Sequence, residues 1–387
     1  MKRMLAGLLA VLLLTGRAGA VSAEAWIVLD TLTGTVRAEG NADARMRIAS
    51  LTKVAAAMAA LNLLDSDSAV TVPEAACRVE GSRMGLVPGE RVTVRALLYG
   101  LLLSSGNDAA LALAAAAEGV SLQDTAGENA GEDLSRTDAA GDAASGEPGA
   151  LVAEMNRIAE ELGLADTRFV NPHGLDAKGH FSTARDLSVL AAAAMADPRL
   201  REITKTREFR GEGYSLHNHN KLLWSLSGCE GVKTGFTKAA GRCLISSVTR
   251  GGRRMVAVTL NAPDDWNDHR ALYDAAFAGM EERVYLPEGA GFALRVESGE
   301  RHTVTVRAAG TLAALLTDAE AARAECCVYL PAFVYAPLQA GEAAGRAELR
   351  LDGRVIAGVP LVYEIDMGEK QPSARERLLS VLRRWLG

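Results

Sequence analysis

Three short motifs occur in order along the chain, and their side chains could together carry out nucleophilic acyl transfer. They are Ser50-Leu-Thr-Lys53, Ser105-Gly-Asn107 and Lys233-Thr-Gly235. Each motif alone is short enough to arise by chance, but the ordered set is not expected from composition. A serine hydroxyl is a poor nucleophile until a base removes its proton. The set supplies a hydroxyl, two amines and an amide, which are groups that such a reaction uses.

Ser50 and Lys53 are three residues apart at the start of a predicted helix, where this spacing places two side chains on one face. We therefore expect the Lys53 amine to reach the Ser50 hydroxyl. A lysine serves as a general base when burial and a second cation lower its pKa, and Lys233 is the candidate for that cation. The free N–H groups of a helix start would also stabilise an oxyanion.

The Lys233-Thr234-Gly235 motif falls on a predicted strand. A strand edge binds an extended peptide by main-chain hydrogen bonds, and a glycine leaves space for close approach. A cation and a hydroxyl at this edge suit the carboxylate that ends a peptide. The motif therefore predicts a carboxypeptidase rather than an endopeptidase.

Helical and strand-like patterns alternate around these motifs. The segment 122–149 differs, because Asp, Glu, Gly, Ala, Ser and Thr dominate it and we expect a flexible surface insertion. Arginines 250, 253 and 254 are expected in a solvated turn between two strands. The predicted elements are a hairpin over 25–37, helices over 48–64, 94–103, 155–164 and 271–278, and strands over 231–248 and 255–260.

From residue 285 onward the pattern changes to short β-like runs separated by Gly and Asp-Gly turns, which predicts a small all-β domain. The runs are 293–296, 302–308, 327–333, 347–351 and 355–364. We expect four segments in all: a signal peptide over 1–23, a peptidase domain over 24–282, a β domain over 283–367 and an amphipathic helix over 368–387.

The two ends of the chain predict export and association with a membrane surface. Lys2 and Arg3 precede an apolar run of signal-peptide length, and small residues at 18–20 or 21–23 offer cleavage sites. Residues 373–387 place Leu, Val and Trp on one helical face and four arginines mostly on the other. That pattern is typical of a helix lying on an anionic membrane, although docking on its own protein is the alternative.

The overall composition argues against two other classes of protein. The formal charge is −6, and removal of a leader with Lys2, Arg3 and Arg17 would make it more negative. Nucleic-acid binding is not expected, because it needs clustered Lys and Arg. No metal or other cofactor is expected, because His217 and His219 lack further ligands at useful spacing. The five cysteines are expected to be mostly buried, and one disulfide between two of them is the alternative.

The chain resembles the low-molecular-weight D-alanyl-D-alanine carboxypeptidases, penicillin-binding proteins of peptidase family S11. The resemblance runs from about residue 25 to 277 and continues more weakly through the β domain. Its matching stretches are Arg47–Lys53, Gly81–Gly85, Leu103–Ala110, Met155-Asn156, Asn171–Leu175, Ser182–Asp186 and Gly231–Lys238.

The resemblance implies an α+β fold, in which an antiparallel sheet with helices on both faces and a helical subdomain is followed by the β domain. It implies that Ser50 is the acylated nucleophile, Lys53 the base and Ser105 a proton relay. Asn107 would hold the substrate amide. Lys233, Thr234 and Gly235 would bind the substrate, and the N–H groups of Ser50 and Phe236 would form the oxyanion hole.

The implied substrate is the peptidoglycan stem peptide at the extracytoplasmic face of the cell membrane, and β-lactams would acylate the same serine. Two departures from the family pattern stand out. Segment 122–149 replaces a short connection, and Asp264–His269 occupies the region where the family often carries a further carboxylate-binding Arg, with Arg270 as a candidate substitute. A serine β-lactamase and a β-lactam or wall sensor that hardly turns over remain alternatives.

Overall fold

The computed structural model describes residues 21–122, 149–371 and 381. Most of the expected leader and all but the first and last residues of the expected insertion lie outside these residues, as does nearly all of the expected C-terminal helix. The described chain divides into two compact units, with the boundary between Ala278 and Gly279. Among the described residues, none of the helices has the length and apolar character needed to span a bilayer.

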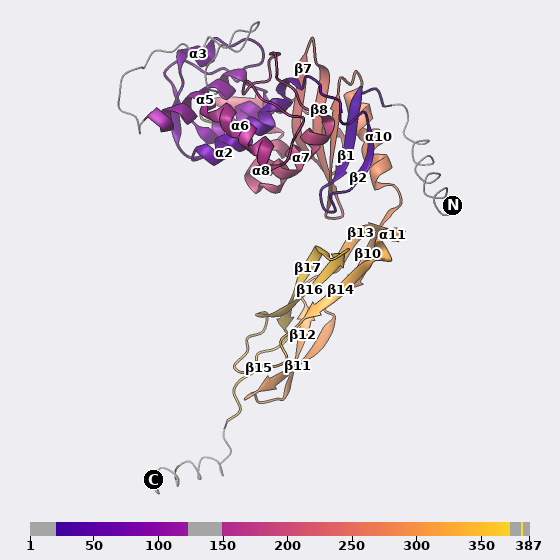
Figure 1. Cartoon of the computed structure of the whole chain (residues 1–387). Helices are drawn as coiled ribbons and strands as arrows, with labels where there is room; N and C mark the ends of the chain where they lie inside the picture. Colours follow the sequence, from indigo (N-terminus) through magenta and orange to yellow (C-terminus); the bar gives the residue numbers. More distant parts are fainter. Residues whose placement is uncertain (1–20, 123–148, 372–380, 382–387) are drawn as a thin grey trace, which may run out of the picture. The chain divides into compact units, whose positions relative to one another are not determined.

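The first unit is built around a five-stranded antiparallel sheet with the order β2-β1-β9-β8-β7 (Figure 1). This order leaves β7 at an edge, with one side free to pair with another extended chain. The strands are β1 (Ala25–Asp30), β2 (Val36–Gly40), β7 (Cys229–Thr237), β8 (Gly241–Arg250) and β9 (Arg253–Leu260).

Helices cover both faces of this sheet, as expected from the resemblance. Alternation along β9 explains the two layers, because Val256, Val258 and Leu260 join the large apolar core while Ala257 and Thr259 point to the opposite face. On that opposite face His269 and Tyr273 of α10 (Asp265–Phe277) bond to strand residues.

The large core is centred on α2 (Lys53–Leu63), an Ala-rich helix buried on nearly every side. Alanine favours the helix and lets its neighbours pack closely. The other helices of the unit are α3 (Glu74–Cys77), α4 (Val94–Leu103), α5 (Asn107–Leu122), α6 (Ala150–Glu161), α7 (Ala184–Ala196), α8 (Pro198–Lys205) and α9 (Leu222–Ser225). Two small hairpins, β3 (Ala69–Thr71) with β4 (Arg91–Thr93) and β5 (Glu208–Gly211) with β6 (Tyr214–His217), complete it.

Two expectations for the sheet were wrong. Residues 231–248 form the hairpin of β7 and β8 rather than one strand, because Gly241 adopts a φ of +68° and Thr237 Oγ1 accepts a hydrogen bond from Ala240 N. The arginines at the β8–β9 turn are not all solvated. Arg253 is 1% exposed and pairs with buried Asp30, with 2.8 Å from Nε to Oδ2.

The second unit is a β structure with its own two apolar clusters. Its six-stranded sheet has the order β14-β16-β17-β12-β11-β15, and β10 pairs with β13. The sequence pattern missed β10 and β13. The elements are β10 (Met280–Leu286), β11 (Gly291–Glu297), β12 (Thr303–Ala308), β13 (Leu312–Thr317), α11 (Asp318–Ala321), β14 (Ala324–Tyr329), β15 (Val334–Tyr335), β16 (Ala343–Leu351) and β17 (Arg354–Tyr363).

All five cysteines lie in the part of the chain that the structure describes; they form no disulfide there, and their burial is lower than expected. Cys243 is buried in the core, but Cys326 is exposed on β14, which is an edge strand.

Candidate active site

Ser50 lies in a single turn of 3-10 helix, η1 (Ala49–Thr52), and Lys53 begins α2 directly after it. The expected α-helical start is thus wrong in detail, but the expected contact is present. Lys53 Nζ lies 2.8 Å from Ser50 Oγ, which is hydrogen-bond distance. Ser50 itself is half-buried.

Lys53 is fully buried, and three oxygen atoms surround its amine. Besides Ser50 Oγ, Nζ lies 2.7 Å from Asn107 Oδ1 and 2.5 Å from the carbonyl oxygen of His173. Burial holds the pKa of Lys53 well below its ordinary value, the charge of Lys233 lowers it further, and Asp108 acts in the opposite direction. A lysine in this environment is neutral at a lower pH than usual and can accept the proton of Ser50.

A buried polar network holds the turn that carries Ser50. Thr52 Oγ1 donates to Ala49 O at 2.8 Å and lies 2.7 Å from His180 Nε2. His180 Nδ1 accepts from Val170 N, so the ring proton is on Nε2 and the imidazole donates to Thr52. The loop that supplies His173 O packs tightly here, since a Cβ on Gly174 would stand 2.1 Å from Ala49 O.

Asn107, the first residue of α5, connects Lys53 to the neighbouring loop. Its Oδ1 faces Lys53, and its Nδ2 donates to the carbonyl oxygen of Glu80 at 2.7 Å. Ser105 lies two residues earlier, in the turn between α4 and α5, and is 6% exposed. The structure thus brings Ser50, Lys53 and Asn107 into direct contact and places Ser105 in the turn that precedes Asn107.

The edge strand β7 carries the third motif. Lys233 is 1% exposed, and burial lowers its pKa to about 7. Within the described chain its Nζ donates one hydrogen bond, to Thr234 O at 2.8 Å, which leaves donors for a ligand. A Cβ on Gly235 would stand 3.2 Å from Ser50 N, so β7 approaches the backbone of Ser50 closely. Phe236 follows at the same edge and is 65% exposed.

Each of the three motifs contains or follows a residue with positive φ. Ala49 precedes Ser50 with φ +47°, Ser105 has φ +59°, and Val232 precedes Lys233 with φ +111°. Such values are unusual for residues other than glycine, and for a β-branched valine the conformation is a clear outlier. Backbone strain of this kind persists where the surroundings enforce it and is concentrated at functional sites. The pattern supports these segments as parts of one site.

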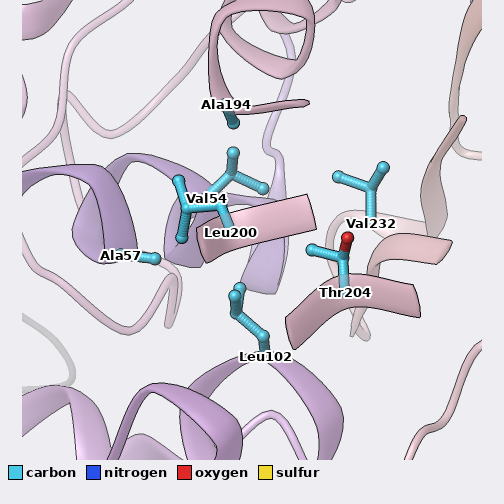
Figure 2. A pocket seen from close by; sticks show the side chains of 7 residues that line it. All are labelled: Val54, Ala57, Leu102, Ala194, Leu200, Thr204 and Val232. Atoms are coloured by element: carbon cyan, nitrogen blue, oxygen red, sulfur yellow. The ribbon is translucent and has the colours of Figure 1, made fainter. Parts of the chain in front are cut away.

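The core contains a small apolar cavity of about 10 Å³ (Figure 2). Val54 follows Lys53 in sequence and Val232 precedes Lys233, so the cavity borders both segments. It is too small for a substrate. The lining residues are Val54, Ala57, Leu102, Ala194, Leu200, Thr204 and Val232.

Other candidate residues lie apart from these contacts. Arg270 of α10 donates to Ser225 Oγ and Asn267 Oδ1. His217 pairs with Glu208 on the β5–β6 hairpin, and in residues 21–122, 149–371 and 381 no three His, Cys, Asp or Glu side chains group as metal ligands. Sequence reasoning did not assign Thr52 or the carbonyl of His173 to the site, although both lie within the family-like stretches.

Comparison with known proteins identifies one family, that of the S11 peptidases. The family model of the S11 peptidases, described as D-alanyl-D-alanine carboxypeptidase, matches residues 14–123 and 136–264. The chain is 33% identical to the D-alanyl-D-alanine carboxypeptidase DacC of Escherichia coli over 367 residues, covering 90% of this chain and 85% of that protein.

Solved structures agree with the sequence matches. Penicillin-binding protein 5 of Haemophilus influenzae superposes with a TM-score of 0.60 at 27% identity, covering 91% of this chain and 99% of that one. A mutant of the Streptomyces K15 DD-transpeptidase gives a TM-score of 0.58 at 30% identity and covers 67% and 99%, respectively.

Proposed function

The chain belongs to the S11 family of D-alanyl-D-alanine carboxypeptidases, and from this premise we propose that it removes the terminal D-alanine of peptidoglycan stem peptides through an acyl-enzyme on Ser50. The observation that carries the proposal is the 2.8 Å contact between Lys53 Nζ and Ser50 Oγ in a site that lowers the lysine pKa. A nucleophile in contact with a general base is the requirement for acyl transfer.

The proposed reaction begins when Lys53 accepts the Ser50 proton and Ser50 Oγ attacks the carbonyl carbon of the penultimate D-alanine. The backbone N–H groups of Ser50 and Phe236 stabilise the oxyanion. Ser105 passes the proton to the leaving amine, and D-alanine departs. Water then attacks the ester, Lys53 again removes a proton, and Ser50 is regenerated.

Substrate binding in this proposal uses β7 and the amide of Asn107. The stem peptide pairs with the free edge of β7 as an additional strand. Lys233 and Thr234 bind the terminal carboxylate of the peptide. The negative charge of this carboxylate compensates the positive charge of the buried Lys233 ammonium. Asn107 Nδ2 and Oδ1 are already bonded to Glu80 O and Lys53, so binding of the substrate amide requires Asn107 to share these bonds.

The test is release of D-alanine from a pentapeptide mimic by the purified protein and by Ser50→Ala, together with labelling by a fluorescent penicillin. Release and labelling that are both lost in Ser50→Ala support the proposal. Labelling without release would indicate a sensor, and rapid hydrolysis of the penicillin would indicate a β-lactamase. A penicillin adduct on another residue would exclude Ser50 as the nucleophile.

We further propose that the protein is exported and that residues 373–387 bind an anionic membrane surface. The support is sequence alone: three of the segment's four arginines, Arg377, Arg383 and Arg384, lie opposite an apolar face. Co-sedimentation with vesicles of anionic and of zwitterionic lipid, for the full chain and for a chain ending at residue 372, tests it. Equal sedimentation of both chains with anionic vesicles would contradict membrane binding by residues 373–387.

A further inference from the structure

Asp108, the second residue of α5, is a buried carboxylate that the reaction described above does not use. It is 1% exposed. Within the described chain its recorded partners are backbone N–H groups rather than a cation. Oδ1 accepts from Met84 N and Ala109 N, each at 2.9 Å, and Oδ2 accepts from Gly85 N at 2.9 Å and Leu86 N at 3.2 Å. One side chain therefore ties three consecutive amides of another loop to the start of α5.

The loop that Asp108 ties down also orients Asn107. The carbonyl of Ser82 accepts a hydrogen bond from Asn107 N at 2.7 Å, and the carbonyl of Glu80 accepts from Asn107 Nδ2 at 2.7 Å. The backbone of this loop lies close to the Asn107 side chain, because a Cβ on Gly81 would stand 2.8 Å from Asn107 Nδ2. With Nδ2 held toward Glu80, the amide must present Oδ1 to Lys53.

Asp108 also affects the charge balance at Lys53. Four titratable groups interact with the Lys53 amine: Lys233 lowers its pKa, Asp108 raises it, and His173 and His180 have their own pKa values lowered to about 3 and about 4, so both imidazoles are neutral near pH 7. Asp108 opposes the effect of Lys233 on the pKa of Lys53. Asp108 thus acts on Lys53 both through the Asn107 amide and through its charge.

We propose that Asp108 is a positioning residue for acyl transfer: its buried carboxylate holds residues 84–86 and, through the Asn107 amide, fixes the Lys53 amine against Ser50. The inference rests on the proposed function, since it concerns the same nucleophile and base. It assigns a role to a residue that touches neither the substrate nor Ser50.

The test compares Asp108→Asn with Asp108→Glu, using the rate of acylation by a fluorescent penicillin as a function of pH. Asp108→Asn removes the charge and part of the acceptor capacity. We expect its maximal acylation rate to fall about 10- to 100-fold, the scale of a small misplacement of reacting groups. We also expect its acid limb to move to lower pH, because loss of the negative charge lowers the pKa of Lys53 further.

Asp108→Glu keeps the charge but displaces the carboxylate, so its maximal rate should fall while its acid limb stays near that of the parent. The matched control is Asp186→Asn in the first turn of α7, where Oδ2 accepts from Asp166 N at 3.0 Å and Thr167 Oγ1 at 2.7 Å. It should keep the parental acid limb and a rate within about twofold.

Acylation rates are normalised to the folded fraction of each variant, measured by circular dichroism. If Asp108→Asn does not fold, the comparison of Asp108→Glu with the unsubstituted protein tests the inference. A normalised rate and acid limb equal to the parent in either folded variant would overturn the inference. The unsubstituted protein is measured in the same way, so that failure of this inference can be told from failure of the proposed function. If the unsubstituted protein showed no acylation or no D-alanine release, the proposed function itself would be contradicted.

Discussion

Gly235 of β7 lies directly against the backbone nitrogen of Ser50. A Cβ built on Gly235 would stand 3.2 Å from Ser50 N, 3.2 Å from Ile48 O and 3.3 Å from the Ala49 Cβ. These three contacts come from the turn that carries the nucleophile, so the absence of a side chain at position 235 sets the distance between the edge strand and that turn.

Gly235→Ala is expected to reduce acylation of Ser50 by about 10- to 1,000-fold, because β7 must shift and would separate the two N–H groups, of Ser50 and Phe236, that we propose as the oxyanion hole. The measurement is kcat/KM for a pentapeptide mimic and the rate of penicillin labelling. The control is Gly358→Ala on β17, where the nearest atom to an added Cβ is Ala347 O at 3.6 Å. Parental activity in Gly235→Ala would show that the close approach has no role in catalysis.

The pH dependence of kcat/KM should be bell-shaped, because the two lysines have opposite requirements. Lys53 must be neutral, so activity rises with pH through its depressed pKa. Lys233 must be protonated to bind a carboxylate, so activity falls as pH rises through its pKa of about 7 in the free protein. Lys233→Arg stays charged and should lose this alkaline limb. A parental kcat/KM that still rises above about pH 9 would contradict these roles.

Lys233→Met should stabilise the fold while it abolishes carboxylate binding. The pKa of Lys233 is about 7 in the folded protein, below the value of about 10.4 in an unfolded chain. The unfolded state therefore binds more protons between these values, and the buried lysine destabilises the fold below them. At pH 7 the substitution should raise the free energy of unfolding by roughly 2–4 kcal/mol.

The measurement for Lys233→Met is urea unfolding at pH 7 and at pH 10, where the gain should largely disappear. Lys221→Met, at an exposed position, is the control and should change stability by less than about 0.5 kcal/mol. A loss of stability at pH 7 would mean that Lys233 is held by favourable interactions instead.

The parts of the site that follow from local spacing were predictable from sequence. Ser50 and Lys53 are one turn apart, and that spacing alone predicted the contact between them, although the turn is a 3-10 helix. The strand position of Lys233 was also predictable from its neighbours. Local patterns carry this information because helix and strand periodicities fix which side chains share a face.

The supports of the site could not be predicted in the same way, because they join residues far apart in sequence. His180 lies within hydrogen-bond distance of Thr52. Arg253 is buried beside Asp30 and forms an ion pair with it, and these two residues lie on neighbouring strands but far apart in the sequence. No periodicity predicts such pairs. The two strands β10 and β13 were missed for a related reason: they pair with each other across the β11–β12 hairpin, so neither has its partner nearby in sequence.

Thr52→Val is expected to destabilise the first unit and slow acylation together. Valine has nearly the same shape, but it leaves His180 Nε2–H and Ala49 O without the hydroxyl that bonds both. A buried donor and acceptor left unsatisfied cost about 1–3 kcal/mol, which urea unfolding at pH 7 would detect. The control is Thr206→Val, where Oγ1 donates a solvent-exposed hydrogen bond to Glu202 O at 2.8 Å, and it should cost less than about 0.5 kcal/mol. Equal effects of the two substitutions would show that the His180–Thr52–Ala49 chain does not hold the nucleophile turn.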